Sequence, residues 1–207
     1  MLDGAMRAAR RGQAVVVTPF TLAGAMAPVT LAGAITQQNA EGLAAIALLQ
    51  QVRPGTPVVY GAFTSNVDMK SGAPAFGTPE YVRAMQMSGQ MARRYGLPLR
   101  ASNANAANAP DAQAMWESVL SLQGSLSGHA NMIYHAAGWM EGGLSASFEK
   151  FVIDCEVLQQ LLYSQQPVPV SADDLALDAI AEVGAASVKD MGKNHDYLSH
   201  YARCVDN

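Results

Sequence analysis

The most informative part of this chain for its expected fold is Pro98-Leu-Arg-Ala-Ser-Asn-Ala-Asn-Ala-Ala-Asn-Ala-Pro-Asp-Ala-Gln113. It begins as a short apolar segment, continues through the amides Asn103, Asn105 and Asn108, and ends in the helix start Pro110-Asp111. A polar loop therefore stands between a predicted buried strand and a predicted helix. In α/β proteins this junction, at the carboxyl end of a parallel strand, is where ligands bind.

The rest of the chain repeats the same strand-loop-helix unit. The three consecutive valines Val15 to Val17 suit a strand that is buried on both faces. Thr78-Pro79-Glu80 is a strong helix start, with a capping threonine and a proline at the first helical position. The predicted strands cover residues 13–20, 57–63, 97–102 and 129–135, and the predicted helices cover residues 30–52, 78–95, 111–126 and the segment after Ser147.

Four units of roughly 40 residues each predict an α/β fold with a parallel sheet and helices packed outside it. Four units are half of an eight-fold barrel, so we expect a partial (β/α)8 TIM barrel of about four βα units with a C-terminal helical tail. Residues 1–165 would form the half-barrel, and residues 166–207 a linker, a helix over 173–183 and a tail. An open flavodoxin-like sheet is the alternative, although such sheets usually carry five strands.

The composition indicates much buried surface. Half of the 207 residues are hydrophobic and 14% are charged, which is below the usual quarter. A half-barrel has two open edges, so we expect a longer polypeptide or a second copy to cover them, and a homo-oligomer fits. A net charge of -4 without a basic stripe argues against nucleic acid. No apolar run is long enough for a membrane span and no signal peptide opens the chain, so a cytoplasmic location is expected.

Cysteines and histidines give no metal pattern. Cys155 falls on the apolar face of a predicted helix, which predicts a reduced thiol in the core. His129 and His135 lie at opposite ends of a predicted strand, too far apart to share one metal ion. His195 and His200 do not have the spacing of a zinc site. We therefore predict no bound metal, and we find neither a phosphate-binding glycine loop nor a nucleophile elbow.

Polar and aromatic residues gather near the predicted strand ends. The loop from Thr64 to Ser71 is either a solvated turn or a polar rim over a site. The strand-end aromatic residues either pack in the core or form a wall that suits a quaternary ammonium ligand. The patch from Gln37 to Glu41 covers much of its helix, so at least one of its side chains should point inward.

A resemblance to a known family rests on many short motifs in one order and spacing. They include Thr30-Leu-Ala-Gly-Ala-Ile-Thr-Gln-Gln-Asn-Ala-Glu41, Pro57-Val-Val-Tyr-Gly61, Gly77-Thr-Pro-Glu80, Ala92-Arg-Arg-Tyr-Gly-Leu-Pro98 and Pro110-Asp-Ala-Gln113. The chain resembles the trimethylamine methyltransferase family, which includes glycine betaine methyltransferases, over roughly residues 14–165. Family members are about twice this length, so the chain looks like the C-terminal part of their barrel.

The resemblance implies a (β/α)8 barrel that passes a methyl group to the cobalt of a separate corrinoid protein. The founding trimethylamine enzymes carry pyrrolysine in the loop that corresponds to Ser102–Asn108, where this chain holds only Ala, Asn and Ser. The sequence is therefore similar to the pyrrolysine-lacking branch, which acts on quaternary amines such as glycine betaine. A quaternary ammonium needs orientation and an aromatic cage rather than a covalent adduct.

Two functions remain open from the sequence. The first is a corrinoid-dependent methyltransferase that takes a methylated amine as substrate, binds no cofactor itself and docks a cognate corrinoid protein. The second is a catalytically inactive half-barrel or binding module. For the first function the predicted substrate-binding residues are Tyr60, Phe63, Asn66, Asp68, Asn103, Asn105, Tyr134 and His135.

Overall fold

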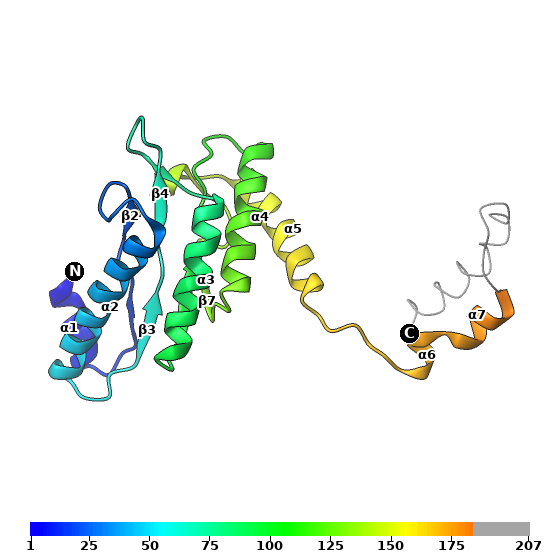
Figure 1. The fold of residues 1–207 in the computed structure, drawn as a ribbon, viewed down its shortest axis with the longest axis horizontal. Helices are drawn as coiled ribbons and strands as arrows, with labels where there is room; N and C mark the ends of the chain where they lie inside the picture. Colours follow the sequence, from blue (N-terminus) through cyan, green and yellow to red (C-terminus); the bar gives the residue numbers. More distant parts are fainter. Residues whose placement is uncertain (184–207) are drawn as a thin grey trace. The chain divides into compact units, whose positions relative to one another are not determined.

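The computed structural model describes residues 1–183 (Figure 1). The chain divides into two compact units, Met1–Ser164 and Gln165–Asn207. His195 and His200, whose spacing is not that of a zinc site, lie outside the described residues.

A parallel sheet forms the centre of the first unit. Its strands lie in the order β1-β3-β6-β7, which is their order along the chain, and each adjacent pair is parallel. The prediction of an α/β fold with a parallel sheet is therefore confirmed. The order is compatible with a barrel segment, and β1 and β7 are the edges of the sheet. The strands are β1 (Val15–Val17), β3 (Val58–Gly61), β6 (Leu99–Ser102) and β7 (Met132–Tyr134).

Each strand is followed by a helix that a capping side chain begins. The hydroxyls of Thr30 and Thr78 and the carboxylate of Asp111 accept backbone N–H groups of the first turns. The caps at Thr78 and Asp111 are those that the sequence predicts. Figure 1 shows α2, α3 and α4 side by side along the sheet, and α5 continues this row against α4. The helices are α2 (Leu31–Val52), α3 (Pro79–Arg94), α4 (Ala112–Ser127) and α5 (Phe148–Ser164).

The register of the sheet separates its two faces. Tyr60 and Leu99 are paired and both lie in the core with Tyr81 and Met85 of α3, so their face is the one that the helices cover. Arg100 is the next residue along β6 and therefore belongs to the opposite face. That opposite face becomes the interior in a closed barrel.

Short strands at the strand ends were not predicted. Strands of two or three residues leave no alternating pattern in a sequence, so periodicity cannot find them. One small sheet has the order β2-β4-β5, and a hairpin pairs β8 with β9. These elements are β2 (Leu22–Ala23), β4 (Ser65–Val67), β5 (Pro74–Ala75), β8 (Trp139–Met140), the 3-10 turn η1 (Glu141–Gly143) and β9 (Ser145–Ala146), and an unpredicted helix α1 (Leu2–Arg10) precedes β1.

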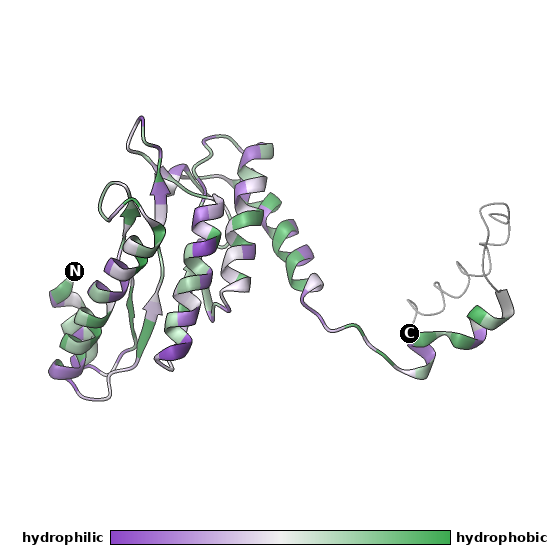
Figure 2. Ribbon diagram, in the orientation of Figure 1, coloured by the Kyte–Doolittle hydropathy of each residue, from purple (hydrophilic) through white to green (hydrophobic). Residues whose placement is uncertain are grey.

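The orientation of α5 is the opposite of the one that its sequence predicts. Its buried residues are Lys150, Asp154 and Val157, whereas Cys155 is exposed. The prediction of a core thiol at Cys155 is wrong, because the Lys150–Asp154 ion pair lets a polar stripe face inward. The apolar stripe that Figure 2 shows along this helix is left accessible, with Phe148 92% exposed.

The second unit contains two short helices within its described part. Ser171 and Asp174 form a reciprocal capping box at the start of α6 (Ala172–Leu175). The predicted single helix over 173–183 is interrupted, because Ala176 adopts a left-handed backbone with φ of 48° before α7 (Leu177–Val183). Among residues 1–183, no helix is both long enough and apolar enough to cross a bilayer.

Candidate functional site

Aromatic side chains meet beyond the carboxyl ends of the strands. Phe63 follows β3, and its ring centroid lies 5.3 Å from both Phe20 and Phe76. Trp139 lies 5.7 Å from Phe76 and stacks on His135 at 4.9 Å. Segments far apart in the sequence therefore build one wall. We call this group, made of Phe20, Phe63, Phe76, Tyr134, His135 and Trp139, the aromatic cluster.

Arg100 enters this cluster from β6. Its guanidinium carbon lies 4.5 Å from the ring centroid of Tyr134 and 5.3 Å from that of Phe63, which is cation–π distance. Arg100 is only 5% exposed, and its Nε and Nη1 have no hydrogen-bond partner among the described residues. Burial lowers the pKa of this guanidinium, but arginine remains charged at neutral pH. Phe63 and Tyr134, two of the predicted substrate-binding residues, thus already contact a cation of the protein itself, the Arg100 guanidinium.

His135 stands at the end of β7 with a left-handed backbone, φ 55°. Burial, followed by the nearby charge of Arg100, lowers the pKa of its imidazole from 6.5. Its Nδ1 is buried without a hydrogen-bond partner among the described residues. A neutral imidazole at physiological pH can accept or donate one hydrogen bond to a ligand.

The amide-rich loop after β6 is buried and held in place. Asn103 and Asn105 are both inaccessible. The Asn103 amide donates to the Ala136 carbonyl at 3.0 Å, and that of Asn105 donates to Ser118 Oγ at 3.4 Å. Their carbonyl oxygens, and Ser102 Oγ, have no partner among the described residues. Buried polar atoms without partners are expensive, which marks this loop as a place where a ligand can bind.

A chain of buried polar groups fixes the loops after β6 and β7 to the helices behind them. Lys150 Nζ bonds Asp154 and donates to Ser118 Oγ at 2.6 Å. Asp154 Oδ2 in turn accepts the N–H of Gly138 at 2.9 Å. Ser118 is also the partner of Asn105. One connected network therefore positions both the amide loop and the turn between His135 and Trp139, a role that sequence reasoning missed.

Glu117 adds a second fixed point to the amide loop. Its Oε2 accepts the N–H groups of Ala106 and Ala107 at 2.7 and 2.9 Å. Gln113 donates to its other carboxylate oxygen at 2.7 Å. The carboxylate thus accepts backbone N–H groups that have no strand or helix partner in this irregular loop.

The structure brings Phe63, Asn103, Asn105, Tyr134 and His135 to this end of the sheet. Tyr60 instead lies on the helix-covered face, where its hydroxyl donates to Asn39 Oδ1 at 3.0 Å and burial raises its pKa. Asp68 is at an exposed turn, where bonds from Ser71 and the Lys70 N–H lower its pKa. Asn66 accepts a bond from Thr78 Oγ1 at 2.8 Å within the β2-β4-β5 sheet region.

Arg100 was not among the predicted site residues. A signal for it existed, because a single charged residue interrupts the predicted buried strand Leu97–Ser102. A fully buried arginine is rare without a partner, so such an interruption indicates either an ion pair or a ligand. Within residues 1–183, no group of three His, Cys, Asp or Glu side chains could hold a metal ion.

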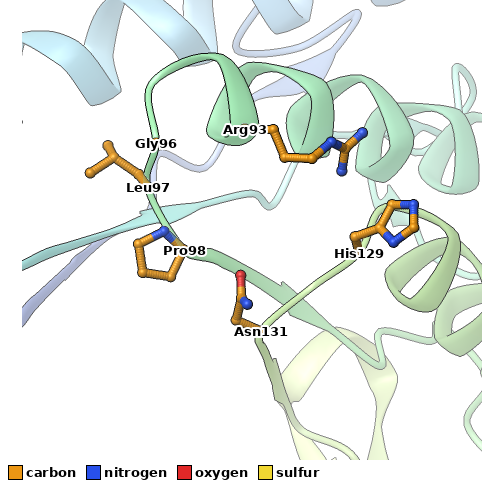
Figure 3. Close-up of a pocket in the computed structure, with 6 residues that line it drawn as sticks. All are labelled: Arg93, Gly96, Leu97, Pro98, His129 and Asn131. Carbon is orange, nitrogen blue, oxygen red and sulfur yellow. The ribbon is translucent and has the colours of Figure 1, made fainter.

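A hollow of about 560 Å³ opens near the other end of the same strands (Figure 3). Two of its polar residues have structural partners: Arg93 donates to the Gly128 carbonyl at 2.9 Å, and Asn131 Oδ1 accepts the Leu99 N–H at 2.9 Å. The amino ends of barrel strands serve stability rather than catalysis. We therefore place the candidate site at the carboxyl ends. The hollow is lined by Arg93, Gly96, Leu97, Pro98, His129 and Asn131.

Parallel strands that present aromatic and unpartnered polar groups at their carboxyl ends place this chain in the class of α/β proteins with a candidate small-ligand site at that end of the sheet. The family model of trimethylamine methyltransferase (MTTB) matches residues 1–204. The chain belongs to this family.

Curated relatives carry related names. The chain is 38% identical over 200 residues to a glycine betaine methyltransferase of Desulfitobacterium hafniense, which covers 94% of this chain and 42% of that protein. It is 38% identical over 203 residues to trimethylamine methyltransferase MttB2 of Methanosarcina mazei, which covers 97% of this chain and 39% of that protein. It is 33% identical over 200 residues to a proline betaine:corrinoid methyltransferase of Eubacterium limosum, covering 96% and 40%. The chain thus spans about two fifths of the length of these relatives.

Proposed function

We propose that this chain is part of a methyltransferase that moves a methyl group from a methylated amine to the cobalt of a corrinoid protein. Family membership and the names of the relatives support the reaction. The structural observation that supports the proposal most is the aromatic cluster with unpartnered polar atoms at the carboxyl ends of parallel strands. The relatives, all named as methyltransferases, do not favour the alternative of an inactive binding module.

The sheet would belong to a closed (β/α)8 barrel that other residues complete. Strand order and parallel pairing are those of consecutive barrel strands. The accessible apolar stripe of α5, with Phe148 and Val152 92% and 68% exposed, is costly to leave in water. Both features support further βα units beside the ones described here.

The residues of this chain would bind and orient the amine at the barrel mouth. Of the predicted substrate-binding residues we retain Phe63, Asn103, Asn105, Tyr134 and His135, since Tyr60, Asn66 and Asp68 have other partners. The aromatic walls would hold the methyl group in one direction, which lowers the entropic part of the barrier. His135, with its lowered pKa, would stay neutral beside a cationic substrate.

The transfer itself requires no covalent adduct with the chain. The N–CH3 bond of the amine breaks, its electron pair stays on nitrogen, and the methyl group passes to the acceptor. Reduced corrinoid cobalt supplies the nucleophile for this displacement. Phe20 and Tyr134, 39% and 40% exposed, keep the cluster accessible, as an acceptor on a separate docked protein requires.

The test uses the full-length protein with reduced corrinoid and a panel of quaternary and tertiary amines. We expect demethylation of at least one amine. Mass spectrometry detects the amine product, and the absorbance of the corrinoid monitors the transfer. His135→Asn, which tolerates the left-handed backbone, should lower this rate. Absence of transfer from every amine in the panel, with free cobalamin and with the cognate corrinoid protein, contradicts the proposal.

A further inference from the structure

The same dipeptide, Phe-Thr, follows two neighbouring strands of the central sheet. Phe20-Thr21 comes after β1, and Phe63-Thr64 comes after β3. The pairing of β1 with β3 and the pairing of β2 with β4 join residues that are 43 positions apart in the chain, as Thr21 and Thr64 are. The two dipeptides therefore lie opposite each other, each between one pair of strands and the next.

The aromatic and the hydroxyl side chains of these dipeptides make separate contacts. The ring centroids of Phe20 and Phe63 lie 5.3 Å apart in the aromatic cluster. The Oγ1 atoms of Thr21 and Thr64 lie 2.5 Å apart, and both threonines are buried. A bond between the two hydroxyls therefore fixes the distance between the two backbones that carry the rings.

Gln38 of α2 connects this pair of hydroxyls to the helices. Its side chain is fully buried, its Oε1 accepts a bond from Thr64 Oγ1 at 2.6 Å, and its amide donates to Ser88 Oγ of α3 at 2.9 Å. Because the single hydroxyl proton of Thr64 goes to Gln38, the proton between the two threonines comes from Thr21. One continuous chain of buried hydrogen bonds thus joins the loops after β1 and β3 to two helices.

Thr56 shows what a buried threonine does away from the aromatic cluster. It is also buried, and its hydroxyl donates to the Arg53 carbonyl at 2.7 Å. It precedes β3, whereas Thr64 follows the same strand and is adjacent to Phe63. The two threonines are therefore alike in burial and in bonding, and they differ in whether they lie next to a ring of the cluster.

We propose that Gln38 is a positioning residue, which acts through Thr64 and Thr21 to hold the rings of Phe20 and Phe63 at the spacing that methyl transfer requires. The inference rests on the proposed function for the reaction, whereas the spacing of the rings can be measured without it. A displacement of about 1 Å in a group that orients a substrate costs about a hundredfold in rate. Loss of the hydrogen-bond chain should therefore lower kcat rather than raise KM.

The first measurement is fluorine NMR of the full-length protein labelled with 5-fluorotryptophan. Trp139 reports on the cluster because its ring centroid lies 6.5 Å from that of Phe63, and its resonance is identified by its loss in Trp139→Phe. Gln38→Met and Thr64→Val, which keep the side-chain volume nearly unchanged, should move this resonance. Thr64→Ser keeps the hydroxyl and should return it to its original position. Thr56→Val, the matched control, should leave it in place.

The second measurement is methyl transfer from glycine betaine to reduced cobalamin by the same proteins. We expect Gln38→Met and Thr64→Val to lower kcat about tenfold, with KM changed by less than about twofold. Thr64→Ser should restore kcat to within about twofold of the unaltered protein, because its hydroxyl remakes the bonds to Gln38 and Thr21. Thr56→Val should leave both constants unchanged.

A Trp139 resonance that stays in place in both Gln38→Met and Thr64→Val, or that moves equally in Thr56→Val, overturns the inference. An unchanged kcat for Thr64→Val in a protein that does transfer methyl groups overturns it as well. A resonance that moves in Gln38→Met and Thr64→Val alone, in a protein that transfers no methyl group from any amine, sustains the positioning role of Gln38 and rejects the proposed reaction instead. The two failures are therefore distinguishable.

Discussion

Single buried polar residues position the loops that follow the carboxyl ends of the strands. Gln38 of α2 is fully buried, donates to Ser88 Oγ at 2.9 Å and accepts from Thr64 Oγ1 at 2.6 Å. Thr64 directly follows Phe63, so the bond to α2 fixes the backbone that carries this ring. The prediction that one residue of the 37–41 patch points inward is thereby confirmed. Such satisfied polar contacts specify one arrangement of the loop.

His135 gives a pH prediction at the residue scale. Its pKa is lowered in the folded state, so between that value and about 6.5 the unfolded chain binds more protons. The free energy of unfolding should therefore fall as pH drops through this window, and remain unaffected by this group above it. Urea midpoints of the full-length protein at pH 8 and pH 5 measure the effect.

His135→Asn removes the titrating group and keeps a residue that adopts positive φ readily. The loss of stability between pH 8 and pH 5 should be smaller in this variant than in the unaltered protein. An equal loss in both proteins would show that His135 does not contribute.

At the scale of elements, the packing of α5 depends on the buried ion pair between Lys150 and Asp154. Lys150→Met leaves the buried Asp154 carboxylate without its cation, which should cost about 3–5 kcal/mol of unfolding free energy. Lys150→Met combined with Asp154→Asn removes both charges, keeps an acceptor for the Gly138 N–H, and should restore at least half of that loss. Urea denaturation of the full-length protein gives both values.

Glu149→Gln is the control for this pair, since Glu149 is an exposed neighbour on the same helix. It should change the unfolding free energy by less than about 0.5 kcal/mol. A loss below 1 kcal/mol for Lys150→Met alone is incompatible with a buried ion pair.

Close approach of α3 to the end of α4 depends on a missing side chain. A Cβ built on Gly89 would lie 2.0 Å from the carbonyl oxygen of Gly128, a backbone atom that cannot rotate away. Gly89→Ala should therefore destabilise the protein by about 1–3 kcal/mol despite the better helix propensity of alanine. Thermal unfolding checks this.

Gly4→Ala serves as the comparison, because nothing lies within 4 Å of the added methyl group in α1. We expect a neutral or slightly raised melting temperature for it. If Gly89→Ala behaves in the same way, the α3–α4 contact is looser than the structure describes.

For the whole molecule, the question is what covers the apolar stripe of α5. If further βα units complete a barrel, Phe148 is buried in the full-length protein, and Phe148→Ala should cost about 3 kcal/mol or more. Gln159→Ala, an exposed polar position on the same helix, should stay within about 0.5 kcal/mol. Equal effects of the two changes would mean that the apolar stripe of α5 faces water in the full-length protein.

Light scattering on the same samples tests the predicted homo-oligomer.

The sequence alone determined the parallel α/β architecture and the positions of the main helices. Local signals carry this information: capping residues such as Thr78 and Asp111, helical periodicity, and runs of β-branched residues. It also placed polar loops at the strand ends, since parallel strands put all their carboxyl ends at one edge.

Which side chains share the site, and which face of α5 is buried, depend on contacts that form in the folded chain. Tyr60 and Phe63 are three residues apart, yet the pairing of Tyr60 with Leu99 places Tyr60 among the helices. Arg100 reaches Phe63 and Tyr134 only because β3, β6 and β7 are neighbours. Lys150 and Asp154 face inward because each neutralises the other, so the apolar stripe with Cys155 turns outward. Contacts between distant segments set these outcomes, and no local pattern encodes them.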